Sequence, residues 1–218
     1  MRQLRRMNSA AGATPSAMKY FWPLPNEFIE GGFMTAMTKR DMRVLLRSRY
    51  KGDEVRRQQS NKICCHILDS QVYLQAGVIA GYVPMKHEAD IMPVLKHALR
   101  TGKALVLPRC DRPPAMTFRR ITSLEELVSG AYGISEPSSD AEIIPLADVD
   151  LVLVPLEGID HQGYRLGKGG GYYDCALAGG QYTTMGCALD WQVIERVPRD
   201  PWDEPLKMCA TPDGINLF

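Results

Sequence analysis

The segment 165–174 combines glycines, cations, tyrosines and a carboxylate at a spacing that suits phosphate binding. It reads Arg-Leu-Gly-Lys-Gly-Gly-Gly-Tyr-Tyr-Asp. Glycines let consecutive backbone amides turn toward an anion, because no Cβ is in the way. Arg165 and Lys168 add cationic donors for phosphate oxygens, and Asp174 can hold a hard divalent cation that bridges phosphates. The segment therefore predicts a phosphate-binding loop with an associated metal ion.

This loop differs from two well-known nucleotide-binding loops. A P-loop requires Ser or Thr after its lysine, whereas Lys168 is followed by Gly169. A dinucleotide-binding fingerprint that began at Gly167 would need a glycine at the position of Tyr172. A flexible surface loop is the simplest alternative, but flexibility alone does not require two cations, two tyrosines and an acid together. A phosphate site of another kind is therefore expected.

Segments on both sides of the loop predict the elements that position it. Residues 151–155 form an aliphatic run that ends at a proline, which predicts a buried strand. Residues 175–178 can propagate as a helix until the pair Gly179-Gly180 ends it. A helix start here would add unsatisfied backbone N–H groups and a positive dipole end to the phosphate site. The expected unit is a strand, a glycine-rich loop and a helix.

Helices and strands are expected to alternate through the rest of the chain. Helices are predicted at 39–47 with Thr38 as N-cap, and at 53–69, 91–100 and, briefly, 123–127. Strands are predicted at 76–83, 104–108, 185–189 and, at an edge, 116–121. This alternation favours a parallel α/β sheet, whose ligands gather at the carboxyl ends of the strands. The segments 83–88 and 108–109 and the glycine-rich loop all follow predicted strands.

The composition limits the class of protein but does not indicate an activity. The chain has 218 residues, 45% of them hydrophobic and 23% charged, which is ordinary for a soluble globular protein. Its net charge of +1 gives no electrostatic reason to expect nucleic acid or a membrane as partner. None of the six cysteines has Cys-x-x-Cys spacing, so we expect buried free thiols in a reducing cytoplasm and no structural zinc.

The first 37 residues differ from the rest. Four cations (Arg2, Arg5, Arg6 and Lys19) precede the first acid, Glu27. No apolar stretch follows the arginines, as a secretory signal would require. An organelle transit peptide is one alternative, but a disordered extension or a start codon placed too early, with Met34 or Met37 as the true start, is favoured. We therefore predict a leader at 1–37 and a single catalytic α/β domain at 38–218.

The glycine-rich run, together with Pro155, Asp160 and Gly163, resembles the signature of the 5-formyltetrahydrofolate cyclo-ligase family, also called 5,10-methenyltetrahydrofolate synthetases. Lys39 and Arg43, four residues apart on one helix face, match a Lys-x-x-x-Arg pair of that family. The resemblance covers residues 38–215 and implies a three-layer α/β/α, Rossmann-like fold with a mostly parallel sheet. It also implies closure of 5-formyltetrahydrofolate to 5,10-methenyltetrahydrofolate with ATP and Mg²⁺, and release of ADP and phosphate.

The resemblance implies a role for each matching residue. The catalytic cations would be Lys39, Arg165 and Lys168. The ATP-binding set would be Lys39, Arg43, Arg165, Leu166, Gly167, Lys168, Gly169, Gly170, Gly171, Tyr172 and Tyr173. The folate-binding set would be Val83, Glu88, Met116 and Tyr132. The Mg²⁺ ligands would be Asp174 and Asp203, with Asp200 as a less well aligned rival. One departure stands near the C-terminus, where Lys207 takes the place of a family acid.

Two other functions stay open at this point. A non-catalytic folate- or nucleotide-binding paralogue would explain Lys207 and the leader, although such a binder need not retain a phosphoryl-transfer site. A sugar-phosphate isomerase or acyl-transfer enzyme would need an acid/base pair, and only Glu88 stands out. The expected partner is a small-molecule substrate, with neither nucleic acid nor membrane, and the expected state is a cytoplasmic monomer or weak homodimer.

Overall fold

The central sheet of the protein has seven strands, most of which run parallel. The computed structural model describes residues 37–112, 114–130 and 133–218. The strand order is β12-β11-β9-β6-β1-β2-β3. The parallel strands are β1 (Val78–Ala80), β2 (Ala104–Cys110), β6 (Leu151–Val154), β9 (Thr184–Cys187) and β11 (Met208–Thr211). The edge strands β3 (Met116–Ile121) and β12 (Gly214–Leu217) are antiparallel to their neighbours. The predicted mostly parallel sheet, with 116–121 at an edge, is confirmed.

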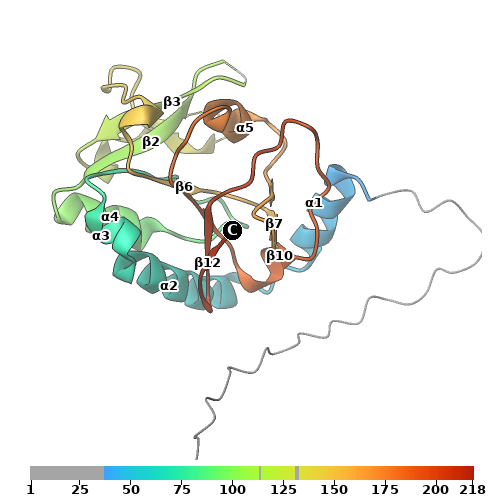
Figure 1. Ribbon diagram of the computed structural model, residues 1–218. Helices are drawn as coiled ribbons and strands as arrows, with labels where there is room; N and C mark the ends of the chain where they lie inside the picture. Colours follow the sequence, from blue (N-terminus) through green and yellow to red (C-terminus); the bar gives the residue numbers. More distant parts are fainter. Residues whose placement is uncertain (1–36, 113, 131–132) are drawn as a thin grey trace, which may run out of the picture. The chain divides into compact units, whose positions relative to one another are not determined.

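Helices cover both faces of this sheet. One face packs against α2 (Asp53–Asp69), α3 (Gln71–Gln75) and α4 (Met92–Arg100), and the other against α5 (Tyr172–Leu177) (Figure 1). Alternate residues of a strand supply the two cores: Leu151 and Leu153 belong to the first, whereas Val152 and Val154 belong to the second. All four are fully buried, as expected for a parallel sheet covered on both sides. The three-layer α/β/α fold is confirmed.

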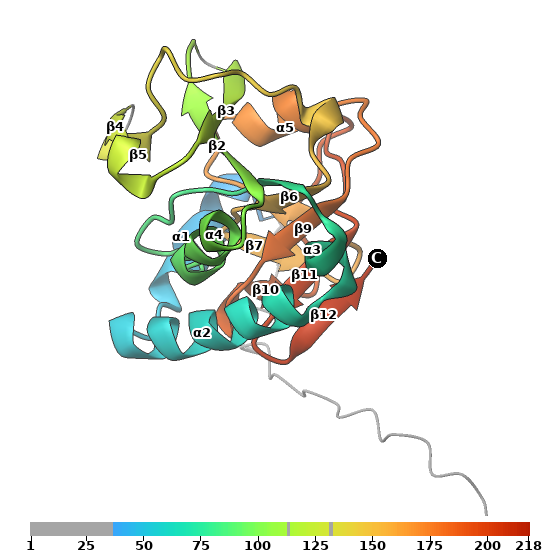
Figure 2. The ribbon, with the colours of Figure 1, turned by 90° about the vertical axis from the view of Figure 1, so that its left-hand side faces the viewer.

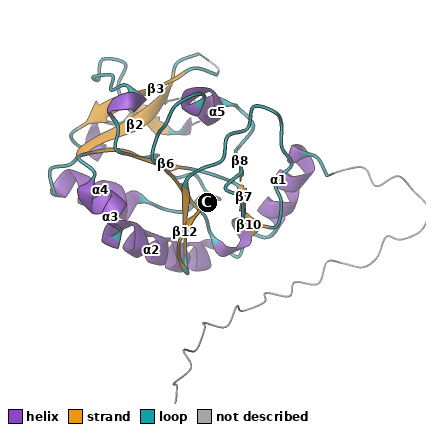
Figure 3. Ribbon diagram, in the orientation of Figure 1, coloured by secondary structure: helices purple, strands orange, loops and turns teal. Residues whose placement is uncertain are grey.

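The helix α1 (Lys39–Ser48) packs against a smaller sheet rather than against the central one. That sheet has the order β10-β7-β8 and consists of β7 (Gly158–Asp160), β8 (Arg165–Leu166) and β10 (Val193–Ile194) (Figure 3). Thr38 caps α1 in a capping box with Asp41, so the predicted N-cap is confirmed. Leu46 is the buried residue of α1 and packs with Leu166 and Val197. The amphipathic helix is thereby fixed beside the strand that leads into the glycine-rich loop.

The order of the central strands creates a switch point between β1 and β6. From β1 the chain continues outward to β2 and β3, whereas β6, β9 and β11 follow on the other side of β1. In an open α/β sheet a crevice forms beyond the carboxyl ends of the strands at such a point. The residues after Ala80 and after Val154 therefore lie where a ligand is expected.

Several predicted elements differ in detail from the structure. The strand predicted at 76–83 spans only Val78–Ala80, because residues 81–84 leave the sheet toward the crevice. The short helix predicted at 123–127 is a 3-10 helix at Leu124–Glu126. The C-terminal hairpin β11–β12 was not predicted, nor was the antiparallel pair of β4 (Val128–Ser129) and β5 (Ser135–Glu136), which lies beside β2 and β3 (Figure 2).

The cysteines are free, as predicted, but they are not all buried. Cys64, Cys187 and Cys209 lie in the cores, whereas Cys65 and Cys175 are exposed. The prediction of burial is wrong for Cys65 and Cys175, because each lies on the outward side of a helix whose opposite side packs on the sheet, and Cys110 is only half-buried. Among the described residues, no helix is both long and apolar enough to cross a membrane.

A compact unit of the chain spans Met37–Phe218. The predicted division into a leader at 1–37 and a catalytic domain at 38–218 stays a prediction. The predicted leader, except for Met37, lies outside the described residues and stays a prediction. The same holds for Tyr132, the aromatic residue of the predicted folate set.

Candidate active site

A cavity of about 350 Å³ opens beyond the carboxyl ends of β1, β2 and β6. This volume is within the range of small-molecule sites. Its walls include Val83, three residues after β1, and Pro155, directly after β6, as the switch point predicts. Most of the residues predicted for the site line it: Val83, Glu88, Met116, Arg165, Gly167, Lys168, Gly169, Gly170, Gly171, Tyr172, Tyr173 and Asp174. The sequence pattern and the topology thus identify the same place.

The glycine-rich loop joins β8 to α5 and forms one wall of this cavity. Gly169 and Gly171 have φ values of +98° and +71°, a region of backbone conformation that favours glycine. Gly171 is the N-cap of α5, which begins at Tyr172 rather than at the predicted residue 175. The earlier start follows from the left-handed turn at Gly171, which directs the chain into the helix immediately. The tyrosine pair and Asp174 are therefore helical and face the site.

An ion pair connects the two ends of the glycine-rich loop. Arg165 Nη2 lies 2.5 Å from Asp174 Oδ1. The side chain of Arg165 is 3% exposed and that of Asp174 is 38% exposed. The pair therefore holds a buried cation at the base of the loop and an accessible carboxylate at the cavity. Leu166, which was predicted to contact ATP, does not line the cavity but packs with Leu46 and Val197 beneath the loop.

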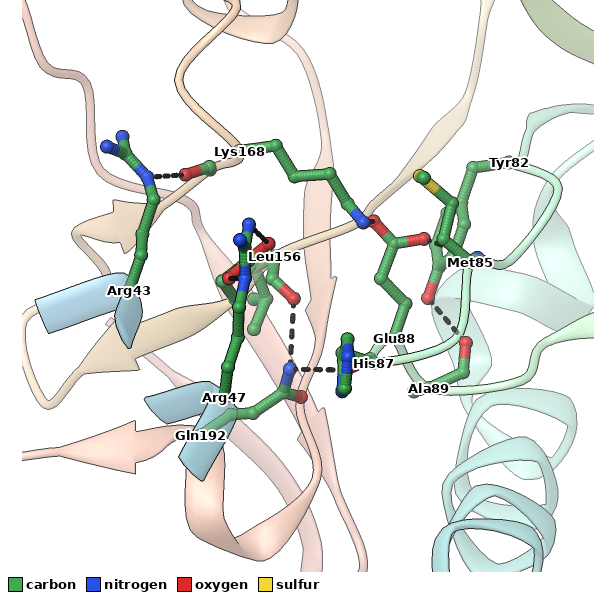
Figure 4. Close-up of polar contacts among 12 residues, drawn as sticks. Arg43, Arg47, Tyr82, Met85, His87, Glu88, Ala89, Leu156, Lys168 and Gln192 are labelled. Carbon is green, nitrogen blue, oxygen red and sulfur yellow. Dashed lines mark hydrogen bonds and ion pairs between the residues drawn. The ribbon is translucent and has the colours of Figure 1, made fainter. Parts of the chain in front are cut away.

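The helix α1 presents two predicted cations toward this region. Arg43 Nε donates to the carbonyl of Gly167 at 2.7 Å (Figure 4). A Cβ on Gly169 would lie 3.3 Å from Arg43 Cζ. Lys39 Nζ donates to Asp200 Oδ2 at 2.7 Å and to Asp203 Oδ2 at 2.5 Å. Partial burial opposes protonation of Lys39, but the two aspartates outweigh it and raise the pKa of this amine. Neither Lys39 nor Arg43 lines the cavity itself.

Glu88 and Lys168 meet across the cavity. Lys168 Nζ lies 3.4 Å from Glu88 Oε1, and Glu88 Oε2 accepts from the backbone N–H of Met85 at 2.8 Å (Figure 4). Burial raises the pKa of the Glu88 carboxyl, and Lys168 opposes that rise. A second hydrogen bond holds the loop that carries Glu88, because Tyr82 Oη donates to Ala89 O at 3.0 Å. The sequence predicted both residues but not their contact, because they are eighty positions apart.

Two further charged groups near the site were missed by the sequence analysis. Arg47 Nε and Nη2 donate to the two carboxylate oxygens of Glu157 at 2.8 and 2.6 Å, and Glu157 is 3% exposed. This bidentate pair joins α1 to the segment after β6. The sequence did contain a signal for Arg47, because this residue follows Lys39 and Arg43 at the same spacing of four residues along one helix face. The second missed group is Glu136, a buried acid on β5 that lines the cavity.

The two predicted metal ligands have different surroundings. Asp174 lines the cavity, whereas Asp203 does not, and its Oδ2 accepts from Lys39 and, at 2.8 Å, from the backbone N–H of Asp200. Within 37–112, 114–130 and 133–218, no three His, Cys, Asp or Glu side chains gather as a metal cluster. Mg²⁺ commonly takes only one or two carboxylates and completes its shell with phosphates and water. Asp174 fits such a site directly, and Asp203 fits only in exchange for Lys39.

Tyr173 places a hydroxyl group without a partner at the cavity. Its Oη is buried and has no hydrogen-bond partner among the described residues, and burial raises its pKa. An unsatisfied buried hydroxyl costs about 1–3 kcal/mol of stability. We therefore expect Tyr173→Phe to have a melting temperature equal to or above that of the wild type, while kcat/KM falls about tenfold through loss of a substrate contact. A lower melting temperature with unchanged kcat/KM would refute this assignment.

Comparison with known proteins gives a consistent result. A family model described as the 5-formyltetrahydrofolate cyclo-ligase family matches residues 36–212. The 5-formyltetrahydrofolate cyclo-ligase of Escherichia coli K12 is 34% identical over 148 residues, which are 65% of this chain and 81% of that protein. The solved structure of Aquifex aeolicus 5,10-methenyltetrahydrofolate synthetase is 34% identical, with a TM-score of 0.74 over 82% of this chain and 92% of that one. A Mycoplasma pneumoniae synthetase, 22% identical with a TM-score of 0.64, shares the fold.

Proposed function

Because the chain belongs to the 5-formyltetrahydrofolate cyclo-ligase family, we propose that it closes 5-formyltetrahydrofolate to 5,10-methenyltetrahydrofolate at the expense of ATP. ADP and phosphate are the other products. The cavity at the switch point is the active site, and the glycine-rich loop is its phosphate-binding wall.

The need for ATP follows from the chemistry of the formyl group. Its oxygen is a poor leaving group, so the γ-phosphoryl group is first transferred to it and an iminium phosphate forms on N5. The N10 nitrogen of the same folate then attacks the formyl carbon and loses its proton. The C–O bond breaks, and the oxygen departs with the phosphate. No protein nucleophile takes part, so the protein contributes positioning and charge neutralisation.

Cations around the glycine-rich loop carry the phosphate chemistry in this proposal. Arg165 and Lys168 contact phosphate oxygens from within the loop, and Arg43 does so from α1 above Gly167. The loop amides complete the nucleotide site, which comprises Lys39, Arg43 and residues 165–173. Lys39 approaches a phosphate after it leaves Asp203. The support is that Arg43, from a distant part of the chain, contacts the same loop that carries Arg165 and Lys168.

Asp174 and Asp203 are the proposed Mg²⁺ ligands. A bound Mg²⁺ neutralises phosphate charge in reactions of this kind. Asp174 is fixed for this task by Arg165, which orients the carboxylate and leaves it accessible at the cavity. Asp203 would be available to a metal ion when Lys39 no longer contacts it, and Lys39 would reach a phosphate only after it had also left Asp200.

The folate occupies the apolar part of the same cavity. Val83 and Met116 supply apolar contacts to the rings, and Tyr132 belongs to this proposed set although it lies outside the described residues. Glu88 accepts hydrogen bonds from N–H groups of the pterin, which a carboxylate does better than a neutral group. Lys207, the departure from the family pattern, lies outside this cavity and lines another one.

One observation carries the proposal above the others: Lys168 Nζ lies 3.4 Å from Glu88 Oε1. A phosphate-binding cation and a pterin-binding acid are thus in one cavity, as transfer of a phosphoryl group to folate requires. The test is to mix purified protein with 5-formyltetrahydrofolate, ATP and Mg²⁺ and to follow the absorbance of the methenyl product. We expect a signal that requires both ATP and Mg²⁺. Protein that binds folate or ATP but gives no signal would instead be a non-catalytic paralogue.

A further inference from the structure

The buried carboxylates of the described residues differ in one respect, which is whether a cation accompanies them. Four acids are at most 4% exposed: Glu88, Glu136, Glu157 and Asp160. Three of them have an ion-pair partner, namely Lys168 for Glu88, Arg47 for Glu157 and Arg199 for Asp160. Within the described part of the chain, Glu136 has no ion-pair partner.

Glu136 is held at the cavity wall by its own strand. It belongs to β5, pairs there with Val128 of β4, and packs directly on Gly130, where a Cβ would collide with its carboxyl group. The thiol of Cys110 at the end of β2, a weak donor, lies near its carboxylate. Burial, together with the nearby Glu136, raises the pKa of this thiol to about 11, so the thiol stays protonated at neutral pH.

A buried carboxylate in this position is costly unless a donor satisfies it. No cation accompanies Glu136 among the described residues, whereas the cavity that it lines is open to a ligand. We propose that Glu136 is a further substrate-binding residue, whose carboxylate accepts hydrogen bonds from N–H groups of the reduced folate. The inference rests on the proposed function, since it assigns a new contact within the same site.

The surroundings of Glu136 indicate folate rather than nucleotide. Its neighbours in the cavity wall include Met116 and Ile134, which suit the faces of flat rings. Phosphate groups would be repelled by the carboxylate, and the phosphate-binding cations Arg165 and Lys168 each have another acid as partner. A reduced folate carries N–H donors on its pterin ring and on the linking nitrogen, so it can satisfy a second acid in addition to Glu88.

Glu136 and Glu88 also differ in the protein groups that already contact their carboxylates. Glu88 accepts from the Met85 amide and faces Lys168. Glu136 has no ion-pair partner among the described residues, so a ligand that donates to it displaces no charged partner. We therefore expect the Glu136 contact to contribute to folate affinity without affecting the binding of ATP.

The test measures binding and stability of Glu136→Gln, which keeps the shape of the side chain. Titration calorimetry with 5-formyltetrahydrofolate, in the absence of nucleotide, should show a Kd about ten- to a hundredfold above that of the wild type, as expected for a hydrogen bond to a charged group. The Kd for a non-hydrolysable ATP analogue should not change. The melting temperature should stay equal or rise, because the variant removes an unpaired buried charge.

Glu142→Gln is the matched control. Glu142 is exposed, lies 3.5 Å from Arg120 and does not line the cavity, so this variant should bind folate as the wild type does. An unchanged folate Kd in Glu136→Gln would overturn the inference. A lower melting temperature with equal loss of folate and ATP affinity would also overturn it, since Glu136 would then be structural. Wild-type protein that binds folate but forms no methenyl product would refute the proposed reaction and leave the binding comparison intact.

Discussion

Arg165→Met is expected to lower kcat/KM for methenyl formation by about a thousandfold, an effect comparable to removing an arginine that neutralises a transferring phosphoryl group. The guanidinium of Arg165 is 3% exposed and lies 2.5 Å from Asp174. Its loss removes the more buried of the two loop cations and leaves the Asp174 carboxylate uncompensated beside the phosphates. Steady-state kinetics with ATP and 5-formyltetrahydrofolate measure the effect.

Two comparisons make this prediction specific. Arg165→Lys keeps the charge but loses the planar fork of donors, so its kcat/KM should lie between those of the wild type and of Arg165→Met. Circular dichroism must show that each variant is folded, because the variants change a buried cation and its pairing with Asp174. A folded Arg165→Met protein with kcat/KM within tenfold of the wild type would show that the loop does not act through this residue.

Asp160→Ala is expected to destabilise the fold by about 3–5 kcal/mol, as for removal of one partner of a buried ion pair. Asp160 is 1% exposed and accepts from three backbone N–H groups and from Arg199 Nη2 at 2.9 Å. These bonds join the β7–β8 turn to the segment around Val197. Urea unfolding measures the loss, and Glu142→Ala, which removes an exposed acid, should change the free energy of unfolding by less than about 0.5 kcal/mol.

The same residue predicts a pH dependence of stability. Burial disfavours the charged form of Asp160, but the backbone donors and Arg199 outweigh burial and hold its pKa below the ordinary value. The folded state therefore binds fewer protons than the unfolded state at this group. Its contribution to stability is fully present above the unfolded-state pKa of about 3.9 and is lost as the pH falls through the lower folded-state pKa. Asp160→Ala should accordingly lose less stability than the wild type between pH 5 and pH 2.

The sequence predicts the parts of the site that depend on local pattern. Glycines with positive φ, a capped amphipathic helix and runs of buried aliphatic residues are local features, so the loop, α1 and the parallel strands could be predicted. The contacts of Lys39 with Asp200 and of Lys168 with Glu88 depend on tertiary packing across much of the chain, and no local signal specifies them. Glu136 was missed for a related reason, because only its burial without a cation distinguishes it from other acids.

Positions of element ends were predicted less well where glycine or tertiary contacts set them. The helix α5 begins three residues earlier than predicted, because Gly171 turns the chain in the left-handed conformation. The β11–β12 hairpin turns through Asp213 and Gly214, whose φ is +141°. An Asp-Gly pair between two short apolar segments is a local hairpin signal, so this turn could have been predicted from the sequence.

The most direct measurement of the central claim follows one oxygen atom. We would prepare 5-formyltetrahydrofolate with ¹⁸O in the formyl group and let the protein convert it with unlabelled ATP and Mg²⁺ in unlabelled water. If the γ-phosphoryl group is transferred to the formyl oxygen, the inorganic phosphate released will carry one ¹⁸O atom per methenyl group formed, as mass spectrometry can detect. Methenyl product accompanied by unlabelled phosphate would contradict the phosphorylated intermediate, and with it the role assigned to the glycine-rich loop.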